Sequence, residues 1–259
     1  MARQVTILKF TGPLGEMSMY NSKYGPIARK RGGPSAKQMK NSPSFRRVRQ
    51  HQSEFSRAAK ASQLLRLAFY PQVMAAKETF TNARLIKLFT QIVKADRVNA
   101  PGMRNVVDGP LEQLNGFEFS LVKFNEAFKG RISATHDRTS KRFTFDVASF
   151  IPSVDVMFHR GATHVRILGS AATVDFNSQN VGGTLIRASV ESELIDIHSD
   201  QSQSLTFTKE LVADNMPVII VAGIQYFEEM NGRYNSLNAE GTNALSIIYV
   251  DKTRGSAVG

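Results

Sequence analysis

Hydrophobic residues follow a helical spacing in the first half of the chain and an alternating spacing in the second half. Ile132 and Ala134, then Phe143, Phe145 and Val147, alternate with polar residues on either side of a turn at 136–141. Successive side chains of a strand point to opposite faces, so this alternation predicts a β-hairpin. Further strands are predicted at 163–168, 184–197, 204–210, 217–228 and 243–250, with Asn231 and Gly232 as a type I′ turn dipeptide.

About seven strands separated by turn residues, without helices between them, favour an antiparallel sheet over a parallel one. We therefore expect residues 117–259 to form an antiparallel β-sandwich, immunoglobulin-like or jelly-roll in type. The strands look like a complete set, so the sequence predicts that this segment folds by itself.

A long helix is predicted to start at Ser42, which can cap free amide groups, and Pro43, which fits a first helical position. On a helical wheel of residues 43–69, one side is mostly apolar: Val48, Phe55, Ala58, Ala59, Ser62, Leu65 and Phe69. The opposite side is basic: Arg46, Arg49, Arg57 and Lys60. Pro71 interrupts this helix, and a second one is predicted from Val73 to Asp96. Its apolar face holds Met74, Leu85, Leu88, Phe89 and Ile92, which predicts a helical hairpin over 42–96.

Glycine and proline are frequent in residues 11–41, which argues against a helix there. Met17 and Met19 alternate with polar neighbours as in a short strand, and the rest of 1–41 is predicted to be an extended arm. Residues 97–116 are again rich in Asn, Pro and Gly and predict a linker. The expected fold class is therefore α+β: an arm at 1–41, a helical hairpin at 42–96, a linker at 97–116 and the sandwich at 117–259.

The charge of the chain is concentrated in its first part. Residues 1–110 hold 20 Lys and Arg against 5 Asp and Glu, a net charge of +15, whereas residues 111–259 hold 13 against 17, a net charge of −4. This asymmetry predicts that the first part meets an anionic partner, either nucleic acid or an acidic protein surface. The alternative is a basic surface that is merely solvated. The predicted partner-binding residues are Arg29, Lys30, Arg31, Arg46, Arg49, Arg57 and Lys60.

Signals for catalysis, metals and membranes are weak in this sequence. The chain has no Cys, no Gly-x-Ser-x-Gly motif and no His-Glu-x-x-His motif. His159 and His164 flank a short turn, but no third metal ligand is identifiable. We expect no enzyme, no cofactor and no metal site. Lys9 interrupts the apolar start of the chain, so no signal peptide is expected, and no stretch reaches the roughly 18 apolar residues of a membrane span. The sequence does not indicate the cellular compartment.

A group of turn-forming and basic residues near the start carries a resemblance. Gly12, Gly15, Tyr20 and the run from Ala28 to Pro34, followed by Asn41, Arg47, Arg49, Glu54 and Phe55, are similar to uncharacterised bacterial proteins, some of them encoded near phage-like structural genes. The resemblance covers about the first fifth of the chain. It implies no catalytic residues.

Two functional hypotheses follow from these observations. In the first, the chain is a structural or assembly subunit, a homo-oligomer or part of a multi-subunit assembly, whose basic N-terminal part docks on a neighbour. In the second, it binds nucleic acid without reading sequence, since no helix-turn-helix, zinc-finger or RNA-recognition motif is present.

Overall fold

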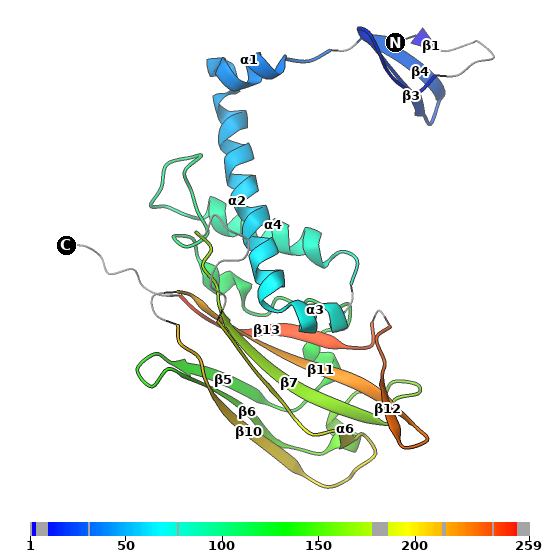
Figure 1. Ribbon diagram of the computed structural model, residues 1–259, viewed down its shortest axis with the longest axis vertical. Helices are drawn as coiled ribbons and strands as arrows, with labels where there is room; N and C mark the ends of the chain where they lie inside the picture. Colours follow the sequence, from blue (N-terminus) through cyan, green and yellow to red (C-terminus); the bar gives the residue numbers. More distant parts are fainter. Residues whose placement is uncertain are drawn as a thin grey trace. The chain divides into compact units, whose positions relative to one another are not determined.

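The computed structural model describes residues 2–3, 10–30, 32–76, 78–177, 186–213, 216–239 and 241–252. The chain forms two compact units, residues 1–49 and residues 50–259. Helices and antiparallel sheets both occur (Figure 1).

The first unit contains a four-stranded antiparallel sheet with the order β1-β4-β3-β2. Its strands are β1 (Ala2–Arg3), β2 (Gly12–Leu14), β3 (Met17–Ser22) and β4 (Gly25–Lys30). Helix α1 (Ala36–Asn41) and the 3-10 turn η1 (Pro43–Phe45) follow. Helix α2 (Arg46–Ala68) starts in this unit.

The segment predicted as an extended arm is thus largely folded. Gly15 (φ 55°) and Gly25 (φ 101°) take the left-handed backbone that lets the chain reverse between neighbouring strands. Gly15 and Gly25 therefore belong to hairpins and not to an extended arm. Helix α1 was also not expected, although Ser35 and Gln38 form a capping box, with Gln38 N donating to Ser35 Oγ at 3.2 Å and Ser35 N donating to Gln38 Oε1 at 2.9 Å.

The predicted helix start at Ser42 holds in part. Pro43 is the first residue of η1, as its fixed φ favours. Ser42 makes no capping hydrogen bond with its side chain; its Oγ lies 2.7 Å from Ser44 Oγ instead.

The second unit combines helices with two antiparallel sheets. One sheet has the strand order β10-β6-β5; the other follows β12-β11-β7-β8, with β13 paired to β11 and β9 paired to β7. The strands are β5 (Ile132–Asp137), β6 (Arg142–Phe150), β7 (His164–Thr173), β8 (Arg187–Glu191), β9 (Ile195–Asp196), β10 (Gln203–Glu210), β11 (Val218–Met230), β12 (Arg233–Ser236) and β13 (Ala244–Asp251). The helical elements, besides most of α2, are α3 (Tyr70–Ala76), α4 (Thr81–Lys94), η2 (Leu111–Leu114), α5 (Phe124–Ala127) and α6 (Pro152–Asp155).

The predicted strands are largely confirmed. The hairpin of β5 and β6 pairs Asp137 with Arg142, and the later ranges correspond to β7, β8 with β9, β10, β11 and β13. The start of the range predicted at 184–197 lies outside the described residues. Asn231 (φ 53°) and Gly232 (φ 77°) connect β11 and β12 with the positive φ angles that a type I′ turn requires.

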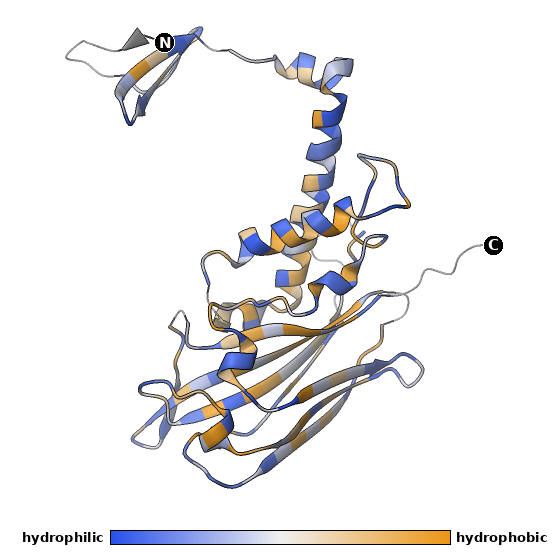
Figure 2. Cartoon of the chain, turned by 180° about the vertical axis from the view of Figure 1, so that it is seen from behind, coloured by the Kyte–Doolittle hydropathy of each residue, from blue (hydrophilic) through white to orange (hydrophobic). Residues whose placement is uncertain are grey.

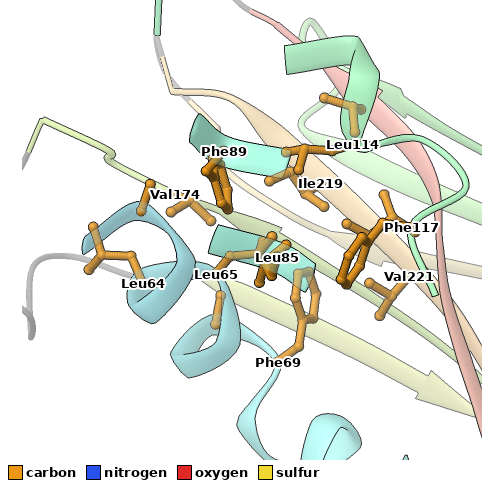
Figure 3. Close-up of a cluster of buried hydrophobic side chains, with 14 of the residues drawn as sticks. Leu64, Leu65, Phe69, Leu85, Phe89, Leu114, Phe117, Val174, Ile219 and Val221 are labelled. Atoms are coloured by element: carbon orange, nitrogen blue, oxygen red, sulfur yellow. The ribbon is translucent and has the colours of Figure 1, made fainter. Parts of the chain in front are cut away.

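One hydrophobic cluster joins the helices to the larger sheet. Leu65 of α2, Leu85 and Phe89 of α4, and Ile219 and Val221 of β11 are completely buried together (Figure 3). Burying each such side chain stabilises the fold by about 1.5–3 kcal/mol. The helices therefore cover one face of this sheet and do not form a hairpin of their own. Figure 2 shows hydrophobic and hydrophilic residues interspersed along α2 and α4, as expected for helices with one buried side.

This cluster changes the predicted domain organisation. The segment predicted as a linker, 97–116, buries Val106, Leu111 and Leu114 in the cluster, so it is part of the core. The helices cover one face of the larger sheet of residues 117–259. The division between compact units falls at residues 49 and 50, inside α2.

A second cluster contains side chains of both sheets. Phe143 and Phe145 of β6 pack with Ile167 of β7 and with Ile220 and Tyr226 of β11, all fully buried. Each of these strands therefore has one face in this cluster, and β7 and β11 contribute their other face to the cluster under the helices. This explains why β11 reads as a nearly continuous apolar run.

Candidate partner-binding surface

Three of the predicted partner-binding residues are exposed in the first unit. The guanidinium of Arg29 lies over the ring of Tyr20, 5.3 Å from its centre, and Lys30 Nζ is 3.5 Å from Glu16 Oε2. Arg46 is exposed at the first position of α2. Arg31 lies outside the described residues. Arg29, Lys30 and Arg46 are thus available to a partner.

Arg49 has a contact inside the first unit. Its Nη1 donates to the main-chain oxygens of Met39, at 2.8 Å, and of Ser42, at 2.9 Å. These oxygens lie at the end of α1, where carbonyl groups have no partner within the helix. Arg49 therefore stabilises the joint between α1 and α2, a role that sequence reasoning did not find.

Arg57 likewise has a role in the fold of the second unit. Its Nη1 donates to the main-chain oxygens of Gly102, at 2.9 Å, and of Arg104, at 2.7 Å. One turn earlier on α2, the buried carboxylate of Glu54 accepts a hydrogen bond from Gly102 N at 2.8 Å. The two side chains hold the segment 97–110 against the helix.

The same segment is organised around Asp96, a buried carboxylate. Oδ1 accepts from the amides of Val98 and Asn99, and Oδ2 accepts from Asn99 Nδ2 and the amide of Asn105, at distances of 2.8 to 3.1 Å. Burial by itself raises the pKa of Asp96, but the hydrogen bonds from Asn99, Asn105 and Val98 together bring the pKa below its ordinary value.

Arg57 and Lys60 come together in a pocket of about 400 Å³ on the second unit. Its lining consists of Ser53, Ser56, Arg57, Lys60, Asn105, Val106, Phe176 and Asn177. Among the described residues that line it, none is a carboxylate. A second hollow, by contrast, contains Asp96, Asp108 and Glu112 together with Lys94, Arg97, Arg104 and Lys252, so its charges largely balance. The structure thus divides the predicted residues between an exposed group, two contacts that hold the fold, and one basic pocket.

Carboxylates gather where β7 begins and β11 ends. Asp196 of β9 pairs with His164, which pairs with Phe227 of β11, next to Glu228 and Glu229. Glu193 and Asp200 flank β9 in the sequence, and the segment 191–200 has no Lys or Arg. Phe158, 66% exposed, contacts the ring of His198 at this end. Glu193, Asp196 and Asp200 are close in the sequence, but only the pairing of β7 with β9 and β11 brings them near Glu228 and Glu229, and sequence reasoning missed this.

Metal-ligand clusters and membrane-spanning helices are not found in the described part of the chain. Within it, no three His, Asp or Glu side chains lie close enough together to hold a metal ion. Its helices include none that is long and apolar enough to cross a membrane.

Comparisons with family models, curated proteins and solved structures gave no match.

Proposed function

We propose that this protein is a structural or assembly subunit whose basic N-terminal unit docks on a neighbouring copy of the same chain. One face of the first unit's sheet, mainly apolar but with Lys30 opposite Met17, carries this proposal. Leu14 pairs with Met17, and Met19 pairs with Ala28, so these four residues share one face. Leu14 is 63% exposed and Met17 is 38% exposed.

The described part of this sheet has little core to stabilise it. Among the described side chains of residues 10–49, Ala28 is the one that is buried. A small sheet becomes stable when its apolar face is packed against something else. An exposed apolar face on a separate unit is also typical of a surface that binds another protein. Both considerations favour a partner on the face that includes Leu14 and Met17.

The net charge of the first unit indicates which surface of the neighbouring copy it would contact. Residues 1–49 hold 11 Lys and Arg and a single carboxylate, a net charge of +10. Two copies of this unit would repel each other if they met face to face. The acidic end of the second unit has a complementary net charge, because its carboxylates outnumber the cations Arg166 and Arg233 beside them. Glu193, Asp196 and Glu229 are exposed there, and so is the apolar side chain of Phe158. The contact we propose is therefore heterologous, between different surfaces of two copies.

Matched charge reversals test the proposal. An N-terminal variant carries Arg29→Glu, Lys30→Glu and Arg46→Glu, and leaves Arg49 and Arg57 in their contacts within the chain. An acidic-end variant carries Glu193→Lys and Glu229→Lys. Each variant alone should lose the self-association that the parent shows in particle mass across a concentration series. Their mixture should regain a complex, because the surface that each variant keeps unchanged complements the unchanged surface of the other, and the two reversed surfaces also complement each other.

The control is a variant with Glu112→Lys and Glu210→Lys, two exposed carboxylates away from the acidic end. It should assemble as the parent does. A parent that stays monomeric at every concentration would contradict the assembly function itself. Assembly that survives both reversals would mean that other surfaces form the contact.

Nucleic-acid binding without sequence preference is the second candidate, favoured by the pairing of Arg29 with Tyr20. Where a cation lies beside an aromatic ring, the cation can contact a phosphate group and the ring can stack on a base. Binding of a generic single-stranded oligonucleotide that weakens steeply as salt rises would support this candidate. Because the proposed assembly contact also depends on charge, it is the binding of the oligonucleotide itself, and not the salt sensitivity of self-association, that separates the two candidates.

We propose further that the two sheets of the second unit form a β-sandwich that serves as the body of the subunit. The cluster shared by β6, β7 and β11 supports this architecture. The immunoglobulin-like or jelly-roll type stays a prediction.

A further inference from the structure

The pocket beside α2 has the composition of an anion site. Ser53, Ser56, Arg57 and Lys60 line it from one face of the helix, because residues three, four and seven positions apart lie on the same side. Two cationic side chains and two side chains with hydroxyl groups thus line one space. The nearby carboxylate of Glu54 is buried and already accepts a hydrogen bond from Gly102 N.

Arg57 is held in place before any ligand arrives. Its two hydrogen bonds to Gly102 O and Arg104 O both use Nη1. A guanidinium carries further N–H groups on Nε and Nη2, whose directions are fixed once Nη1 is anchored. A fixed donor loses little freedom when it binds an anion, and this favours affinity.

The opposite wall of the pocket is partly apolar. Val106 and Phe176 contribute buried hydrophobic side chains, and the ring of Phe176 packs on Phe89 with centres 5.5 Å apart. The amides of Asn105 and Asn177 lie beside them. A volume of about 400 Å³ lies within the range of small-molecule sites.

We propose that this pocket binds a small phosphate-bearing ligand. The phosphate group would lie against Arg57, Lys60 and the two serine hydroxyls, since such groups form charge-assisted hydrogen bonds with phosphate oxygens. The remainder of a phosphate ester would contact Val106 and Phe176. This site is separate from the proposed assembly contact, and it can exist whether or not the protein assembles.

The test uses the full chain labelled with ¹⁵N and titrated with inorganic phosphate, then with adenosine monophosphate. Saturable shifts of the amide signals of Ser53, Ser56, Asn105 and Asn177 are expected. Lys60→Gln should weaken binding by about tenfold or more, as expected for the loss of one charge-assisted hydrogen bond. Lys87→Gln, at an exposed position of α4, is the matched control and should bind as the parent does.

The two probes separate the possible sources of the phosphate group. Tighter binding of the nucleotide indicates an ester that uses the apolar wall, and equal binding indicates free phosphate. The proposal is overturned if the pocket amides do not shift, if shifts are confined to residues 10–49, or if Lys60→Gln and Lys87→Gln bind equally well. Because the readout is local to the pocket, failure here leaves the assembly proposal intact, and the reverse also holds.

Discussion

Arg57 Nη1 on α2 donates to the main-chain oxygen of Arg104, 47 residues away in the sequence and 2.7 Å away in space. With the bond to Gly102 O, this contact fastens the segment 97–110 to the helix. A residue selected from the sequence as a partner-binding cation therefore acts within its own chain.

Replacing Arg57 by Met should destabilise the protein, because two carbonyl groups lose their donor. The expected loss is about 1–3 kcal/mol in the free energy of unfolding. Urea denaturation measures it. Arg46→Met, an exposed position on the same helix, should leave the unfolding midpoint unchanged. Equal stability of the two variants would show that the contact contributes nothing.

The substitution Asp96→Asn should also destabilise the fold and change its pH dependence. The new Nδ2 would face the N–H donors of Asn99 and Asn105, at a cost of about 1–3 kcal/mol. The pKa of Asp96 in the folded state is lowered from 3.8. The extra stability that the ionised carboxylate gives the wild type is therefore fully present above about pH 3.8, and it is lost as the pH falls through the lower folded value.

Urea denaturation at neutral pH and at about pH 3 therefore tests the direction of this pH dependence. The difference between wild type and Asp96→Asn should be large at neutral pH and smaller in acid. Glu112→Gln, at an exposed carboxylate of η2, should show no such difference. A difference in stability that grows on acidification would contradict a lowered pKa for Asp96.

Gly169 of β7 lies against the ring of Phe145 on β6. A Cβ at position 169 would be 2.6 Å from Phe145 Cδ2 and 2.7 Å from Cγ, so the ring must move. Gly169→Ala should cost about 1–3 kcal/mol, the usual effect of overpacking a core. Gly32→Ala is the matched control, because its Cβ meets no atom within 4 Å.

Adding Phe145→Leu to Gly169→Ala should recover part of the loss, since a smaller side chain leaves room for the methyl group. Chemical denaturation of the single and double variants measures this coupling. Purely additive effects would mean that the two sheets do not touch at this point.

A fragment of residues 117–259 should aggregate or unfold without cooperativity. Removing the helices uncovers Ile219, Val221, Leu245 and Ile247, which are buried in the cluster on that face of the sheet. Residues 50–259 keep this layer and should unfold cooperatively. Light scattering measures the aggregation of both fragments, and chemical denaturation measures whether each unfolds cooperatively. A monomeric, cooperative 117–259 fragment would restore the domain boundaries that the sequence predicts.

The sequence by itself determined the elements whose signals are local. Alternation at Phe143 and Phe145, the turn at Asn231 and Gly232, and the apolar face of α4 each lie within a few residues, where backbone geometry and side-chain period are enough. The concentration of positive charge in residues 1–49 is also plain from the sequence.

Only the tertiary structure decided which residues of each element are buried and which other elements they contact. The wheel placed Phe55 and Leu65 on the same side of α2, yet Phe55 is 54% exposed and Leu65 is fully buried, because the sheet covers only part of the helix. The wheel likewise grouped Arg46 with Arg57, and only contact with a distant loop distinguishes them. Long-range packing sets the cost of exposing each side chain, and a periodic pattern along the chain does not contain that information.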